Sequence, residues 1–468
     1  MSDSTRTKDI LRLFGLVSAA VVLVVCCVIR IDGLSAEAVR TLGVLAATLL
    51  LLVFETFNVC VSCMLSCALL FCFGCVDGIG AAFSGYSNHI LYFTTASFGI
   101  SLAFQKSQLS KRLLSVVIRN KNLTFRRLIL MFMLCAATLS SIMSNVAAVV
   151  IFIPFAEELL SHFSNVDKKA RSRRTMMICL TVSTMIGGMI TPAGSSMNLI
   201  CLDMLEKYAG ASVRFVDWII IGLPIAAFML VAAFLVITRV YPPEELTEEE
   251  LKGYISKTSE KSRFTSKDIY TAAVIFTIVA LWLISSWIPE INITVVAIAG
   301  LAMLFLPKFS VMTWEEFSAS ISWGTFFVAG SLISVAAAVT STGLCDYFVS
   351  LIFPEDAVLP VFVAVMLVAA VTFVVMALLP SAPAVISILS PIIIGFADNS
   401  GINAVMLVMV CALCVSNIYL FPLDAPLVVA YDKKAFKMFE LPKATIWLQL
   451  IMIVAVSLWM PIVFGIIS

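Results

Sequence analysis

The chain has 468 residues, of which 61% are apolar and only 13% are Asp, Glu, Lys or Arg. A typical soluble domain is about 45–50% apolar and about 25% charged. So few charged side chains, with a net charge of +1, exclude a cytosolic enzyme, a secreted disulfide scaffold and a nucleic-acid-binding protein. A membrane span takes about 20 apolar residues, so the composition predicts an all-α membrane protein that crosses the bilayer many times.

The apolar segments predict about 11 transmembrane helices, each near the length of one span. The first follows a polar stretch and exceeds the apolar core of a signal peptide, which is about 7–15 residues. We therefore expect it to be retained. The expected spans are residues 11–30, 37–54, 57–76, 88–105, 175–207, 216–240, 269–289, 291–307, 321–341, 402–431 and 442–467.

Two further apolar stretches, 126–160 and 358–396, are each interrupted near the middle by polar or helix-breaking residues. If both are re-entrant hairpins that return to their starting side, most of the 30 Lys and Arg residues fall on one side of the membrane. Cytoplasmic loops carry such an excess. The pattern therefore predicts two re-entrant hairpins, a cytoplasmic amino terminus and an external carboxyl terminus in the cell membrane.

Unusual features recur in the same order in the two halves of the chain. Ser144 interrupts the first hairpin and Pro154 follows ten residues later; Ser381 and Pro391 have the same spacing in the second. The predicted organisation is residues 1–36 (cytoplasmic amino terminus and first span), 37–240 (first repeat), 241–268 (cytoplasmic, solvated linker) and 269–468 (second repeat). Two inverted-topology repeats with paired broken helices are typical of secondary transporters.

A Pro-containing break interrupts one apolar helix in each repeat. The first, within 175–207, reads Thr-Pro-Ala-Gly-Ser-Ser-Met-Asn from Thr191; the second, within 402–431, reads Phe-Pro-Leu-Asp-Ala-Pro-Leu-Val from Phe421. Non-helical backbone at membrane depth persists only when it is buried in protein or lines a wet cavity. The free N–H groups of such a backbone segment can bind an anion, and its carbonyl oxygens can bind a cation. Helix kinking alone is the alternative interpretation.

The 13 cysteines include three Cys-x-x-Cys pairs, but they lie mostly inside apolar runs and the chain has only two histidines. We interpret them as small packing residues rather than as metal or redox groups. The sequence shows no catalytic constellation, so we expect no enzyme, no catalytic residue, no resident metal and no cofactor beyond a coupling ion.

Asp424 lies inside the second predicted break. A carboxylate at the centre of a span costs roughly 2.5–3.5 kcal/mol on insertion scales. We hypothesise that Asp424 supplies a fixed negative charge for cation coupling or titrates and couples protons. Capping of a helix end, or pairing with a basic residue, is the alternative.

At these residues the chain resembles the divalent anion:sodium symporter (DASS) family of the ion transporter superfamily. Its Ser-Asn-Thr hairpin triplet is matched at two positions by Ser144-Asn145-Val146, and Gly187-Gly188 with the Thr191 to Asn198 motif resembles its first unwound segment. Glu55 and the Trp323-Gly324-Thr325 stretch are similar to further family positions. Ala382, Pro383, Ala425 and Val428 depart from the family pattern in the second repeat.

The resemblance implies an elevator-type homodimer that carries di- or tricarboxylates or sulfate, usually with sodium. Carried over by position, the implied cation-binding residues, to which we add Asp424, are Ser140, Ser144, Asn145, Gly188, Thr191, Gly194 and Asn198. The implied substrate-binding residues are Asn145, Ser195, Ser381, Pro422, Ala425 and Pro426.

Sodium symport of di- or tricarboxylates is therefore the leading functional prediction, with a small anion and the lipid bilayer as partners and no nucleic acid. A proton-coupled carboxylate carrier, or an anion exchanger of the same fold, is the nearest alternative. An arsenite-type oxyanion efflux carrier and a non-transporting membrane receptor are more distant ones.

Overall fold

The computed structural model describes residues 3–54, 56–109, 112, 124–247, 249–250, 254, 265–288, 290–345, 347, 359–378, 382–420 and 424–467. Within these ranges the regular elements are helices, and no residue is in a β-strand. The predicted all-α fold class is confirmed for this part of the chain.

Seven of the described helices are long and apolar enough to cross a membrane. They lie within Ile10–Val28, Ala36–Val53, Phe215–Val240, Ser266–Ile284, Trp323–Ser341, Ala382–Ser400 and Met438–Ile466. Shorter apolar helices occupy Val59–Cys72, Ile293–Leu304, Val361–Ala377 and Ala404–Val415. The polytopic membrane class follows, whereas the number of eleven crossings stays a prediction.

Large apolar side chains are exposed along whole helix faces, which a water-soluble surface does not tolerate. On the last helix they recur about every four residues, the spacing of one helix face: Ile446, Leu450, Val454, Leu458 and Ile462. Such a face is expected where lipid tails are the solvent.

The chain divides into two compact units, each built from several separate segments. Unit 1 comprises residues 1–92, 200–212 and 322–415; unit 2 comprises 93–199, 213–321 and 416–468. Because each unit draws on both halves of the chain, the units differ from the two predicted repeats. The repeat boundaries stay a prediction.

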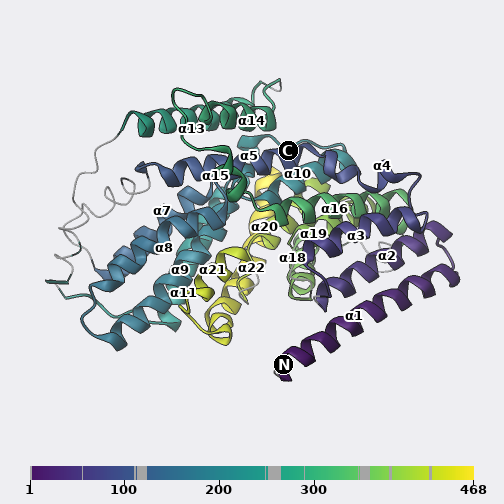
Figure 1. Ribbon diagram of the computed structural model, residues 1–468, viewed down its shortest axis with the longest axis horizontal. Coiled ribbons are helices and arrows are strands. Elements are labelled where there is room, and N and C mark those ends of the chain that lie inside the picture. Colours follow the sequence, from purple (N-terminus) through teal and green to yellow (C-terminus); the bar gives the residue numbers. More distant parts are fainter. Residues whose placement is uncertain are drawn as a thin grey trace. The chain divides into compact units, whose positions relative to one another are not determined.

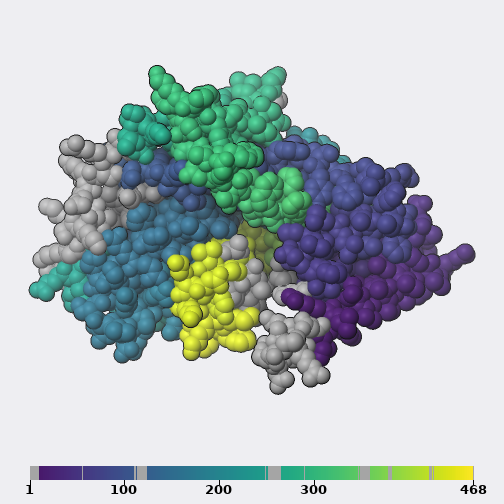
Figure 2. All heavy atoms as spheres, in the orientation of Figure 1, coloured from purple at the N-terminus to yellow at the C-terminus, as the bar shows by residue number. Residues whose placement is uncertain are grey.

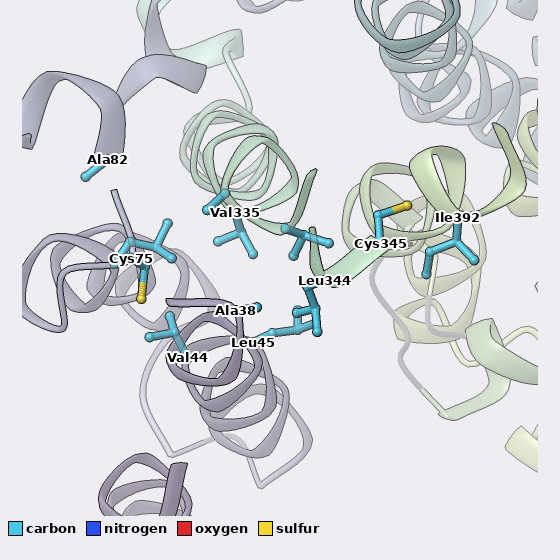
Figure 3. Close-up of a cluster of buried hydrophobic side chains, with 12 residues drawn as sticks. Ala38, Val44, Leu45, Cys75, Ala82, Val335, Leu344, Cys345 and Ile392 are labelled. Atoms are coloured by element: carbon cyan, nitrogen blue, oxygen red, sulfur yellow. The ribbon is translucent and has the colours of Figure 1, made fainter. Parts of the chain in front are cut away.

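Unit 1 packs its helices around buried small and branched side chains (Figure 3). Ala38, Val44 and Leu45 of α2 meet Val335 of α16 and Leu344 in one cluster. The elements of unit 1 are α1 (Asp3–Val28), α2 (Ala36–Val53), α3 (Val59–Cys72), α4 (Ile79–Ala82), η1 (Ser84–Ser87), most of α10 (Ser196–Ala209), α16 (Trp323–Ser341), α18 (Val361–Leu378), α19 (Ala382–Ser400) and α20 (Ala404–Val415).

Unit 2 holds the first predicted hairpin and the helix that follows it. Helices α7, α8 and α9 lie side by side (Figure 1) and pack pairwise against one another. The elements of unit 2 are most of α5 (His89–Lys106), α7 (Phe125–Ser140), α8 (Asn145–Ser161), α9 (Val166–Gly188), η2 (Pro192–Gly194), the start of α10, α11 (Phe215–Val240), α13 (Ser266–Ile284), α14 (Ile293–Leu304), α15 (Trp314–Ser320), α21 (Ala425–Asp432), η3 (Met438–Glu440) and α22 (Leu441–Ile467).

Close backbone contact holds α7 against α9. A Cβ added to Gly187 would lie 2.3 Å from the carbonyl oxygen of Ala137, so only glycine lets the two helices approach this far. The α11 helix and α22 also pack together, and the indole Nε1–H of Trp459 donates to the carbonyl of Ile221 at 3.0 Å.

The acidic linker, expected to be simply solvated within 241–268, is bound to the helices where it is described. Glu245 Oε2 accepts the backbone N–H of Phe125 at 2.6 Å, one of the amides that every helix start leaves without an intrahelical partner. Glu250 accepts the backbone N–H of Ser164 at 2.8 Å and its hydroxyl at 2.7 Å. The Ser164 hydroxyl first, and then the backbone N–H groups of Thr247 and Ser164, lower the pKa of Glu250 to about 2.

Candidate functional site

The turn between α7 and α8 brings Asn145 to an oxygen-rich spot in unit 2. Ser140 Oγ lies 2.7 Å from one terminal amide atom of Asn145. With Nδ2 at that position, the amide donates to Ser140 Oγ, to the carbonyl of Thr184 at 3.2 Å and to that of Gly194 at 3.1 Å. We assign this orientation because it satisfies all three contacts, whereas an oxygen there would face two carbonyls. Oxygens from α7, α9 and the following break thus converge on one point.

The break after α9 follows directly from its sequence. The helix ends at Gly188, and Pro192, which has no N–H to donate, starts the short η2 turn. Thr191 caps that turn, because its Oγ1 accepts the N–H of Gly194 at 3.2 Å. The same hydroxyl donates to the carbonyl of Ser141. Thr191 therefore ties the break to the α7–α8 turn.

Asn198, which follows the break, hydrogen-bonds back to the start of the break and carries an unsatisfied acceptor. Its Nδ2 donates to the carbonyls of Gly188 at 2.8 Å and Thr191 at 2.9 Å, so the amide orientation is fixed. Its Oδ1 is fully buried and has no hydrogen-bond partner within the described part of the chain. A buried acceptor left in this way costs about 1–3 kcal/mol.

Two glycines allow the backbone segments of the site to meet. A Cβ on Gly188 would lie 2.3 Å from the Asn145 amide atom assigned as Nδ2, and one on Gly194 would lie 2.6 Å from the carbonyl oxygen of Gly188. Both separations are shorter than side chains tolerate. The Gly-Gly pair before the break is thus required by close approach around Asn145.

The second break lies between α20 and α21 and contacts the first. Ser416 Oγ lies 3.4 Å from Ser195 Oγ. One residue further on, the carbonyl of Asn417 accepts Nε2 of Gln449 on α22 at 2.7 Å. Gln449 Oε1 is a second buried acceptor without a partner in the described ranges. The start of the second break is therefore fixed both to the first break and to α22.

Asp424 stands directly before α21, and its carbonyl accepts the N–H groups of Leu427 and Val428 at 3.0 Å each. The eight-residue α21 packs against both α8 and α9. Figure 2 shows the yellow carboxy-terminal segment directly beside the blue segment that holds these helices. Asp424 thus directly precedes a helix that packs against α8 and α9, the two helices next to the first break.

The structure brings six of the eight predicted cation-binding residues together and places Ser144 and Asp424 apart from them. Hydrogen bonds and close backbone approaches join these six in one cluster: Ser140, Asn145, Gly188, Thr191, Gly194 and Asn198. Ser144 is the N-cap residue of α8 and makes no side-chain cap hydrogen bond. Asp424 belongs to the second break.

Of the predicted substrate-binding residues, Asn145 is in the cluster and Ser195 lies at its edge. Pro426 is buried in the first turn of α21, and Ala425 is the first residue of that helix. Ser381 and Pro422 lie outside the described residues, as does Glu55.

The sequence comparison of the two breaks missed Thr184 and Ser416. Thr184 contributes a carbonyl, which no side-chain motif reveals, although its position one turn before Gly188 was a signal. Ser416 precedes the segment that begins at Phe421 by five residues. Its polar neighbour Asn417 at the end of an apolar helix was the available cue.

The site offers oxygen ligands and no soft ones. No group of three or more His, Cys, Asp or Glu side chains within the described ranges is arranged to hold a metal ion. Neutral amide, hydroxyl and carbonyl oxygens are the ligands that hard cations prefer. The cluster is chemically suited to a small monovalent cation that must bind and leave.

Apolar helices with exposed apolar faces define a multi-pass membrane protein, and broken apolar helices are typical of secondary transporters. The family described as the sodium:sulfate symporter transmembrane region matches residues 8–466. The chain therefore belongs to that family, as its motifs indicated.

Several curated proteins are similar over most of their length. A protein of Cupriavidus necator named "Membrane protein" is 22% identical, covering 95% of this chain and 92% of its own. The "Sodium-dependent dicarboxylate transporter SdcS" of Staphylococcus saprophyticus is 20% identical over 80% of this chain and 76% of its own. The protein of that name from Staphylococcus aureus is 21% identical over 82% and 78%.

Proposed function

We propose that this protein carries small anions, most simply di- or tricarboxylates, across the plasma membrane in symport with sodium. Membership of the sodium:sulfate symporter family and the names of the staphylococcal relatives support sodium coupling and an anionic substrate. Sulfate remains within the proposed class because the family description names it.

The observation that carries the proposal is the oxygen cluster around the first break. Ser140, Thr184 and Gly194 direct oxygens at the Asn145 amide, and Asn198 holds a buried Oδ1 that needs a partner. In this proposal a bound sodium ion replaces Nδ2 as the partner of these oxygens, and the amide turns to present Oδ1. A sodium ion satisfies such an acceptor and recovers about 1–3 kcal/mol of desolvation cost. Because the ligands are neutral, the site can release the ion again. Ser144 and Thr191 complete the proposed cation set.

The anion is bound, in this proposal, by residues of both hairpins and both breaks: Asn145, Ser195, Ser381, Pro422, Ala425 and Pro426. The first turns of α8 and α21 present backbone N–H groups and the positive ends of helix dipoles, which favour carboxylates. No Lys or Arg occurs between Thr191 and Asn198 or between Ser416 and Pro426. The sodium ion thus serves as the counter-charge.

Asp424 gives one specific reason to consider proton coupling as the second candidate. It replaces the glycine of the first break, Gly194, at the equivalent position of the second break. A carboxylate there stabilises a second cation or takes up a proton. In the first case Asp424 supplies a charged oxygen ligand in a break whose neutral ligands, the family's Thr and Asn, are replaced by Ala425 and Val428.

An elevator movement of a homodimer, with a cytoplasmic amino terminus and an external carboxyl terminus, completes the proposal. The family resemblance supports the movement and the dimer. The excess of Lys and Arg in the predicted cytoplasmic loops supports the orientation. Cross-linking between protomers tests the homodimer, and the accessibility of tags at the two termini tests the orientation.

Uptake of labelled succinate, citrate and sulfate into proteoliposomes, under a sodium gradient or a pH gradient alone, tests the function. We expect an inward sodium gradient to drive accumulation of at least one of these anions. Accumulation that follows only the pH gradient supports the Asp424 alternative. Uptake that ignores both gradients and requires an internal anion refutes symport.

A further inference from the structure

One arginine side chain of unit 2 joins two helices to the turn that follows a third, at the end remote from the breaks. Arg173 of α9 donates to Glu157 of α8, with Nη2 2.6 Å and Nε 2.9 Å from Oε1. The same guanidinium donates from Nη1 to the carbonyl of Lys434 at 3.1 Å and from Nη2 to that of Lys433 at 2.9 Å. We call these four residues the Arg173 clamp. With 22% of its side chain exposed, Arg173 is largely sheltered from water.

The chain after α21 is folded to present both carbonyls to Arg173. The N–H of Ala435 donates to the carbonyl of Ala430 at 3.3 Å, and that of Lys434 donates to the carbonyl of Tyr431 at 2.7 Å. This is a Schellman ending, which places its turn residue in the left-handed region. That residue is usually glycine, yet here Lys434 has a φ of 54°. Such a conformation costs about 1–2 kcal/mol for an L-residue and is offset by favourable contacts such as those of the clamp.

The helix lengths relate the clamp to the proposed binding residues. At 1.5 Å per residue, Glu157 lies about 18 Å along α8 from Asn145, and Arg173 lies about 22 Å along α9 from Gly188. Asn145 meets Gly188 at one end of this helix pair and Glu157 meets Arg173 at the other. The clamp holds the turn directly after α21, an eight-residue helix about 12 Å long that packs against α8 and α9. The break before α21 contacts the first break through Ser416 and Ser195. The first residue of α21, Ala425, follows Asp424.

We propose that Arg173 is a positioning residue that fixes α21 against the hairpin helix α8, and so couples the anion half of the transport site to its cation half. The proposal rests on the proposed function and assigns a role to a residue that touches neither ion. Because the guanidinium of Arg173 holds both α8 and α21, sodium bound near Asn145 favours the position of α21 that suits the anion.

Only an arginine can make these contacts together. A lysine retains the charge but offers one compact ammonium instead of a planar fork. In an Arg173→Lys variant the ammonium keeps Glu157 and loses at least one carbonyl. The loss of one hydrogen bond to a charged group corresponds to about a tenfold change in an equilibrium constant.

The matched control is Arg171→Lys on the same helix. Arg171 pairs with Glu244 at 3.2 Å and its side chain is 66% exposed, so its ion pair contributes little. Both variants and the unmodified protein are reconstituted in equal folded amounts. Succinate uptake is measured against sodium concentration and against succinate concentration, and amide hydrogen exchange is measured in α8 and α21.

For Arg173→Lys we expect half-saturating sodium and succinate concentrations about tenfold higher, with maximal turnover retained and faster exchange in α21. Arg171→Lys should match the unmodified protein in each quantity. Unchanged saturation and unchanged exchange in Arg173→Lys overturn the clamp, as does a loss of turnover with no change in saturation. If the unmodified protein transports nothing while Arg173→Lys still accelerates exchange in α21, the proposed function fails and the clamp stands.

Discussion

Replacement of Gly188 by alanine is the most direct perturbation of the oxygen cluster. With Asn145 in its assigned orientation, the added Cβ would lie 2.3 Å from Nδ2, 2.9 Å from Oδ1 and 3.0 Å from Cγ of that residue. The clash is with the terminal amide group of Asn145, and moving that group away would break its hydrogen bonds. Asn145 is also held by Ser140 and by the carbonyls of Thr184 and Gly194.

The magnitude follows from these contacts. Forcing extra atoms into a packed site costs about 1–3 kcal/mol, and each hydrogen bond that Asn145 loses adds about 0.5–1.5 kcal/mol. If half of that cost destabilises the sodium-bound form relative to the sodium-free form, the sodium affinity decreases about tenfold or more. Alanine is also a better helix former than glycine by about 1 kcal/mol, so without the clash the variant would be more stable.

Sodium-dependent stabilisation measures this effect without transport. A ligand that binds only the folded protein raises its Tm as its concentration exceeds its Kd. We expect the Tm of Gly188→Ala in detergent to respond to sodium only at concentrations about tenfold higher than those needed by the unmodified protein. The control is Gly465→Ala on α22, where an added Cβ meets nothing within 4 Å. A sodium response of Gly188→Ala equal to that of the control would refute the assignment of this cluster to sodium.

Three further changes test separate parts of the account. Asp424→Asn removes a charge from the second break, and we expect it to alter the dependence of uptake on sodium or pH; an unchanged ion dependence contradicts a coupling role. Asn198→Leu leaves the carbonyls of Gly188 and Thr191 without their donor, so we expect the free energy of unfolding to decrease by about 2 kcal/mol. We also expect sodium to cause no rise in the Tm of this variant. A retained rise shows that Oδ1 of Asn198 is not a sodium ligand. The pKa of Glu250 lies below its ordinary value of 4.5, at about 2, so its stabilising contacts persist above pH 4.5 and weaken as the pH falls toward 2. The Tm of Glu250→Gln should therefore vary less with pH over this window than that of the unmodified protein. Parallel curves of Tm against pH for the two proteins argue against the linker contact.

The membrane class and the site-forming break were accessible from sequence because both depend on local patterns. Long apolar runs define the helices, and the Gly187-Gly188 pair followed by Pro192 ends α9 where the sequence indicated. The residues from Ser140 to Asn198 were gathered by a resemblance, and the structure adds the reason, since Gly188 admits the Asn145 amide.

Long-range polar contacts were not accessible in the same way. The acidic linker was interpreted as solvated, but Glu245 caps the start of α7, a contact over 120 residues of sequence. The carbonyl of Thr184 carries no side-chain signature, and Arg173 is one of several basic residues at the start of α9. Which of them reaches Lys433 and Lys434 depends on how α21 packs, and no local pattern specifies that.

Joint flux of radiolabelled sodium and succinate into proteoliposomes, for the unmodified protein and for Asn145→Ala, tests the central claim most directly. The account predicts that the two fluxes rise together with sodium in the unmodified protein, and that Asn145→Ala shifts both to higher sodium concentration by the same factor. Succinate accumulation without accompanying sodium, or an Asn145→Ala variant whose sodium dependence is unchanged, would contradict it.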